Sequence, residues 1–161
     1  MRKRIGALRN AQAGGHAASD LLDAWLDLEP IAAVEVTSED PRFPIESALS
    51  GDGPGWRASQ GGEQQIRIVF DAPRPLHRIQ LRFQETGSER TQEFTIRWVP
   101  AAGGAAREIV RQQWNFNPAG SAVEIENYDV DLDAVSALEL TIRPDIGRTD
   151  AVATLGSWRV S

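Results

Sequence analysis

The chain of 161 residues contains no cysteine. A disulfide framework, a cysteine nucleophile and a thiolate metal site are therefore excluded. Histidine is almost as scarce, with only His16 and His77. Two histidines this far apart disfavour a histidine metal cluster or a Ser-His-Asp triad, so the usual catalytic centres find little support.

Long hydrophobic runs are also missing. None approaches the roughly 20 apolar residues of a membrane helix. Residues 6–18 follow a basic start but lack the continuous apolar core of a secretory signal. We therefore predict a cytoplasmic protein with no membrane partner.

Basic residues are outnumbered, with 17 Lys and Arg against 23 Asp and Glu and a net charge of −6. Four of the basic residues, Arg2, Lys3, Arg4 and Arg9, lie in the first ten positions, which leaves an acidic body. Surfaces that capture a phosphate backbone need clustered lysine and arginine. We expect no nucleic-acid partner.

The length is that of one domain, which buries about 70% of the surface of its unfolded chain. Residues 1–17 are basic, rich in Ala and Gly and without sustained period, which predicts a flexible tail. Residues 18–161 then form the single domain. Ser19 is a suitable N-cap for a short amphipathic helix at about 19–28, which Pro30 ends.

After residue 32 the hydrophobic period changes from 3.6 to 2, and turn signals recur about every ten residues. Ile79, Leu81 and Phe83, for example, alternate with polar side chains. Strands with one apolar and one polar face pack as antiparallel sheets around one core. The pattern predicts an all-β, eight-stranded antiparallel β-sandwich. Its strands are expected at 32–37, 64–70, 76–83, 91–98, 107–114, 121–131, 136–142 and 151–160.

Two acidic patterns in the later strands resemble catalytic or metal motifs. Glu124 and Glu126 share a strand face, as paired carboxylates of a glycoside hydrolase do. A solvated face, with Val123 and Ile125 buried opposite, is the simpler interpretation. The sequence from Asp129 imitates the start of a calcium loop but lacks the required glycine and final glutamate.

If successive strands are antiparallel, loops 38–63, 84–90, 115–120 and 143–150 emerge at one end of the sandwich, and these loops hold most of the polar chemistry. Directional hydrogen bonds from a fixed guanidinium and carboxylates, with an aromatic ring for stacking, suit a hydroxylated ligand. For Arg90 and Glu85 a loop-stabilising ion pair is an equal alternative. The candidate ligand-binding residues are Glu85, Arg90, Trp114, Asn115, Asp145 and Arg148.

Several motifs resemble the discoidin-like, or galactose-binding-like, jelly rolls, which include coagulation-factor type C domains and carbohydrate-binding modules. They are Val36-Thr37-Ser38, a helical turn at 45–49, Gly51-Asp52-Gly53, Trp56-Arg57-Ala58 and the paired strands at 66–83. The resemblance covers residues 32–160 and implies a jelly roll with Trp56 in the core. It implies no cofactor other than a structural calcium at Asp52. It extends to the N-terminal domain of a eukaryotic single-strand-break repair scaffold.

Two functions follow from the resemblance. The leading hypothesis is a non-catalytic module that binds carbohydrate at the polar loop end. The alternative is a protein-interaction domain of a scaffold, which docks a protein ligand through the 21–28 helix or a sheet face. A hydrolase ranks third, because the sequence offers no convincing nucleophile, base or metal cluster.

Overall fold

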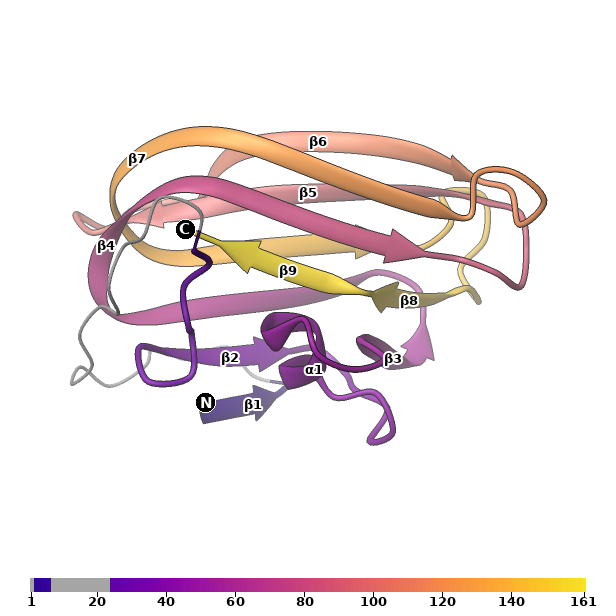
Figure 1. The fold of residues 1–161 in the computed structure, drawn as a ribbon, viewed down its shortest axis with the longest axis horizontal. Helices are drawn as coiled ribbons and strands as arrows, with labels where there is room; N and C mark the ends of the chain where they lie inside the picture. The colour runs from indigo at the N-terminus through magenta and orange to yellow at the C-terminus, as the bar shows by residue number, and fades with distance from the viewer. Residues whose placement is uncertain (1, 7–23) are drawn as a thin grey trace.

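A computed structural model describes residues 2–6 and 24–161. These residues form a β-sandwich with one short helix (Figure 1), which confirms the predicted all-β class. The elements are β1 (Arg2–Ile5), β2 (Ala32–Val36), α1 (Ile45–Ser50), β3 (Trp56–Gly61), β4 (Gln64–Gln84), β5 (Arg90–Pro100), β6 (Arg107–Phe116), β7 (Val123–Arg143), β8 (Val152–Leu155) and β9 (Ser157–Val160).

Two long strands, β4 and β7, hold the sandwich together. Each is 21 residues long, and they pair antiparallel along most of their length. The register shifts around Arg74, beside two prolines that cannot donate to the ladder. Here both strands curve from one layer into the other (Figure 1). The sequence predicted two separate strands in each of these regions.

The halves of β4 and β7 complete two layers. The first half of β4 and the second half of β7 lie in one sheet with β1, β2, β5 and β6, while β9 pairs with the second half of β4. Phe83 on β4 contacts Phe94 on β5, with ring centroids 5.1 Å apart, and joins the layers. Trp56 is fully buried in the core, as expected. Its indole N–H donates to the Ser38 carbonyl at 3.2 Å.

The described residues of the predicted N-terminal tail are part of the folded domain. β1 pairs in parallel with β2, and the Lys3 ammonium lies 2.9 Å from Glu39 and 2.8 Å from Glu46. The tail prediction is wrong for residues 2–5, because carboxylates of the body pair with its basic side chains. Residues 7–17 of the predicted tail lie outside the described residues.

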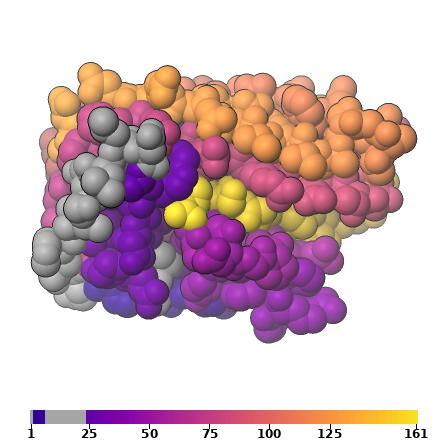
Figure 2. Space-filling view, in the orientation of Figure 1, coloured from indigo at the N-terminus to yellow at the C-terminus, as the bar shows by residue number. Residues whose placement is uncertain are grey.

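The predicted helix at 19–28 is also wrong where it can be compared. Residues 24–28 are not helical. The Leu26 amide donates to the Val160 carbonyl at 2.8 Å, and Leu26 and Leu28 are buried, so the alternation of these leucines fits an extended segment equally well. This segment and α1 flank β9 (Figure 2). Residues 19–23 lie outside the described residues.

In the first half of β7 the buried and the exposed faces are the reverse of those predicted. Glu124 is 1% exposed and Ile125 is 55% exposed. Glu124 pairs with the buried Phe83 of β4, and cross-strand partners point to the same face of a sheet. Pairing with β4 therefore turns Glu124 and Glu126 inward and the two apolar residues outward.

Two further strand boundaries differ from the prediction. β3 lies in the stretch expected to be a loop and pairs with β8. The predicted strand at 151–160 is split at Gly156 into β8 and β9, which pair with different strands. No helix among the described residues is long and apolar enough to span a membrane.

Candidate functional site

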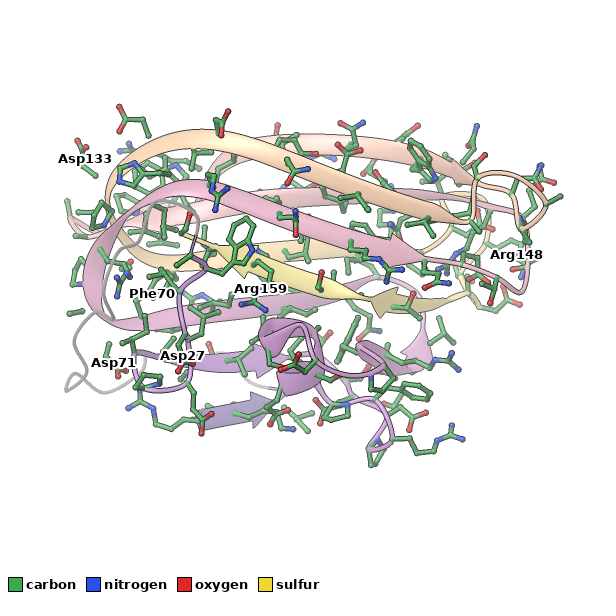
Figure 3. All side chains as sticks on the ribbon, in the orientation of Figure 1. Asp27, Phe70, Asp71, Asp133, Arg148 and Arg159 are labelled. Atoms are coloured by element: carbon green, nitrogen blue, oxygen red, sulfur yellow. The ribbon has the colours of Figure 1, made fainter. Side chains whose placement is uncertain are left out.

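Three of the four polar loops, 84–90, 115–120 and 143–150, meet at one end of the sandwich, as the antiparallel order predicts, whereas the 38–63 stretch contains α1 and β3. The Glu85 amide donates to the Ala122 carbonyl at 2.8 Å, and the Ile146 amide donates to the Thr91 carbonyl at 2.9 Å. Arg148 lies at this end and Asp133 at the opposite end (Figure 3). We call the surface formed by residues 84–91, 115–122 and 143–152 the loop end.

Arg90, the first residue of β5, is buried beneath the loop end. Its side chain is 4% exposed and its Nη2 lies 3.1 Å from Glu85 Oε2. Nη1 donates to the Val152 carbonyl at 3.0 Å, and the guanidinium lies 5.6 Å from the Phe116 ring centroid. Burial lowers the pKa of Arg90, while Glu85 and Asp145 oppose that change. Arg90 therefore links β5, β6 and β8 beneath the surface of the loop end.

Glu85 shapes the loop that precedes β5. Its Oε1 accepts hydrogen bonds from the Gly87 amide at 2.7 Å and the Ser88 amide at 3.2 Å. The other oxygen faces Arg90. One carboxylate thus closes a local turn and ties it to a buried cation. This is the loop-stabilising role that the sequence left as the alternative.

Arg148 is the most accessible of the candidate cations, with 58% of its side chain exposed. Its Nε lies 3.3 Å from Asp150 and 3.8 Å from Asp145. Asp145 is largely buried and accepts a hydrogen bond from the Gly147 amide at 3.0 Å. The 143–150 loop therefore presents a guanidinium that is held in place by carboxylates.

Asn115 and Trp114 occupy opposite faces of β6. Asn115 is exposed and its side-chain oxygen accepts from the Thr91 hydroxyl at 2.5 Å, so it lies at the margin of the loop end. Trp114 pairs with the buried Gln92 and packs against the core. The structure thus brings together Glu85, Arg90, Asn115, Asp145 and Arg148, whereas Trp114 points between the layers.

Ile146 is an exposed apolar side chain at the loop end, 42% accessible, and sequence reasoning passed over it. Its position beside Asp145 and Arg148 gives the surface an apolar contact that Trp114 does not supply. The available signal was an isolated isoleucine within a polar, glycine-containing turn.

A calcium ion at Asp52 finds few ligands in the structure. Calcium takes six to eight oxygens, commonly including several carboxylates. Asp52 is exposed, and no group of three His, Cys, Asp or Glu side chains in residues 2–6 and 24–161 is placed to hold a metal. The residues present do not fit a carboxylate-rich calcium site.

The two bent long strands and the layered sheets have the fold of the galactose-binding-like jelly rolls. The likeness to solved structures supports this fold assignment at identities too low to transfer function. No protein-family model and no curated protein sequence matches the chain.

Three solved structures illustrate the likeness. The family 32 carbohydrate-binding module of C. perfringens NanJ, in complex with galactose, is 17% identical with a TM-score of 0.58, covering 80% of this chain and 92% of that one. Module CBM32-3 of a family 31 glycoside hydrolase from Clostridium perfringens is 19% identical with a TM-score of 0.61, covering 84% and 93%. The lectin domain of Lectinolysin, complexed with Lewis b antigen, is 11% identical with a TM-score of 0.54, covering 80% and 90%.

Proposed function

We propose that this domain is a non-catalytic carbohydrate-binding module and that its sugar site is the loop end. The observation that carries the proposal is the set of hydrogen bonds that ties three polar loops together beside an exposed arginine. Structural neighbours with this fold have been solved with galactose and with Lewis b antigen. A rigid scaffold that presents polar groups suits weak, directional recognition of hydroxyl groups.

The residues divide into those that contact the sugar and those that hold the loops. Arg148 and Asn115 would donate hydrogen bonds to ring hydroxyls, and Ile146 would pack against the apolar face of the sugar. Glu85 and Arg90 would keep the loops in place from below. No catalytic step is assigned to any of these side chains.

Docking of a protein through the 21–28 helix is a weaker candidate. Its motivation was an amphipathic helix, and residues 24–28 instead run non-helical beside β9. Leu26 and Leu28 of that stretch are buried in the core, so they do not form an apolar surface for a partner. Nothing in the described part of this segment favours a partner protein over a sugar.

A glycan-array screen, followed by titration of any hit, tests the proposal. Arg148→Ala should weaken binding at least fivefold, because it removes the exposed donor of the loop end. Arg107→Ala, near the opposite end, is the matched control and should bind as the wild type does. The proposal is wrong if the folded protein binds no glycan, or if Arg148→Ala and Arg107→Ala weaken glycan binding equally.

A further inference from the structure

A groove of about 410 Å³ crosses the outward face of the layer that contains β2, β4, β7, β5 and β6. Its lining comes from β4, β5, β6 and β7, from Glu63 just before β4 and from Thr37 directly after β2. Sites for small ligands typically have volumes of about 300–1,000 Å³. We call this space the sheet groove.

The floor of the sheet groove is a row of short polar side chains. Thr95 on β5 is the cross-strand partner of Thr141 on β7, which in turn pairs with Gln65 on β4. Cross-strand partners point to the same face of a sheet. Phe94 and Ile96, on either side of Thr95, are buried in the core, so the row faces outward. Thr95 is nevertheless only 4% exposed, which places it at the bottom of a depression.

Longer charged side chains form the walls around this row. Two residues before Thr95, Glu93 pairs across the ladder with Arg143. Two residues after Thr95, on the same outward face, lies Arg97. At the β6 end of the row, Arg111 is the cross-strand partner of Thr95. The groove is deepest at the threonines because these side chains are short and their neighbours are long.

Arg97 is a cation of the sheet groove that no carboxylate of the described chain holds. Its cross-strand neighbours are Glu139 and Glu108, one residue on each adjacent strand. Glu139 instead lies 3.2 Å from Arg67, and Glu108 lies 3.2 Å from Arg111. Arg97 itself is half-buried and forms no ion pair with any residue in the described ranges. Its guanidinium is therefore available to an anion in the groove.

The floor hydroxyls are available as well. In residues 2–6 and 24–161, neither the Thr95 nor the Thr141 hydroxyl forms a hydrogen bond within the protein. The Glu93 carboxylate, by contrast, accepts from Arg111 at 3.2 Å and from Gln113 at 3.1 Å. The acidic wall is thus engaged by its neighbours, whereas the floor and Arg97 are not.

The charge of the sheet groove is opposite to that of the whole protein. Its lining holds three guanidiniums against two carboxylates, a balance of +1, while the net charge of the chain is −6. A protein of this charge does not attract anions in general. An anion that binds here must therefore be recognised by the local groups.

We propose that the sheet groove binds a sugar acid, with its carboxylate on Arg97 and its hydroxyls on the threonine floor. A guanidinium presents donors in a planar fork that matches two carboxylate oxygens. A threonine hydroxyl both donates and accepts, so Thr95 and Thr141 suit the hydroxyls of the ligand. The groove shares only Arg143 with the loop end, and this inference does not rest on the carbohydrate proposal for that end.

Amide chemical-shift titration by NMR at pH 7 tests the sheet groove with two sources of this chemistry. Galacturonate represents an acidic residue of a glycan, and gluconate represents a free sugar acid. Their neutral counterparts, galactose and sorbitol, carry a hydroxymethyl group in place of the carboxylate. Affinity is measured from amides within 64–66, 94–97 and 139–141, so binding at the loop end does not enter the value. At least one acid should bind at least tenfold more tightly than its neutral counterpart.

Two variants test the assigned groups. Arg97→Gln should weaken binding of the acid at least fivefold, because it removes the charge that faces the carboxylate. Thr95→Val keeps the shape of the side chain, removes the floor hydroxyl and should weaken binding at least twofold. Arg82→Gln changes a half-buried arginine on the outward face of the other layer and is the matched control, which should bind as the wild type does. Thermal melts check that each variant folds.

The proposal is overturned if neither acid shifts the groove amides, or if the neutral counterparts shift them with equal affinity. It is also overturned if folded Arg97→Gln or folded Thr95→Val keeps full affinity. Shifts caused by galactose at the loop end are a separate readout. Failure of the sheet groove therefore leaves the loop-end proposal standing, and the reverse also holds.

Discussion

Replacing Arg90 with alanine removes the buried cation that holds the loop end together. The change leaves Glu85 facing an apolar gap and deprives the Val152 carbonyl of its donor. It also removes the guanidinium from the Phe116 ring. We expect a large loss of stability, although Arg90 lies at the surface end of a strand.

The magnitude follows from these contacts. Stranding one partner of a fully buried ion pair costs about 3–5 kcal/mol. Glu85 is 17% exposed and keeps two backbone donors, which lowers the cost of the lost ion pair to about 0–2 kcal/mol, nearer the value for an exposed pair. The lost cation–π contact and the unpaired carbonyl each add about 1 kcal/mol. The sum for Arg90→Ala is about 2–4 kcal/mol, a large share of the roughly 5–15 kcal/mol of a typical domain.

Urea unfolding followed by tryptophan fluorescence measures this loss. Arg143→Ala is the matched control, because Arg143 is half exposed and its Nη1 lies 3.9 Å from Glu93. Exposed pairs of this kind contribute about 0–1 kcal/mol. If Arg90→Ala costs no more than the control, Arg90 does not link the loops, and the division of roles at the loop end is wrong.

Three further outcomes are expected. Burial, and then the neighbouring Glu126, raise the pKa of Glu124 to about 8, so Glu124 keeps a proton in the folded state up to about pH 8 that the unfolded chain loses near pH 4.5. The free energy of unfolding should therefore fall as the pH rises between these values, by at most about 1.4 kcal/mol per pH unit. Glu124→Gln should flatten this slope in urea-unfolding curves, and a wild-type stability that does not change with pH would contradict the prediction. Gly55 has φ 86° and a Cβ there would lie 2.5 Å from the Leu155 carbonyl, so Gly55→Ala should cost roughly 2 kcal/mol or more, against less for the unobstructed Gly103→Ala in thermal melts. Lys3→Ala should speed hydrogen exchange of the β1 amides while core amides stay protected, and unchanged exchange would show that its ion pairs do not hold β1.

The fold class and the loop end were predictable because both depend on local pattern. Alternation of apolar and polar residues marks strands, and antiparallel order sorts the loops without knowledge of their contacts. Ile79, Leu81 and Phe83 therefore fell on the correct face. The resemblance also predicted a helical turn at 45–49, where the structure has α1.

The errors arose where distant pairing decides the outcome. In β7 the sequence alternates cleanly, but only pairing with β4 determines that Glu124 faces inward and Ile125 outward. Hydrophobicity alone favoured the reverse. Residues 2–5 contain one apolar residue, Ile5, and therefore show no alternation, and their place in the sheet depends on β2 and on carboxylates more than 30 positions away.

The same limit applied to the candidate site. The sequence placed Arg90 near the polar loops, but its burial depends on Val152 and Phe116, which are distant in sequence. Trp114 was assigned to the loop-end surface because it closes a strand. Its register with Gln92 instead turns it toward the space between the layers.

The central claim is that a sugar binds at the loop end, and amide chemical-shift mapping by NMR tests it most directly. Titration with galactose, or with any glycan-array hit, should shift amides within 84–91, 115–122 and 143–152 in a saturable way and leave the 99–106 loop unchanged. Saturable shifts confined to another face, or none in a folded sample at millimolar sugar, would contradict the account.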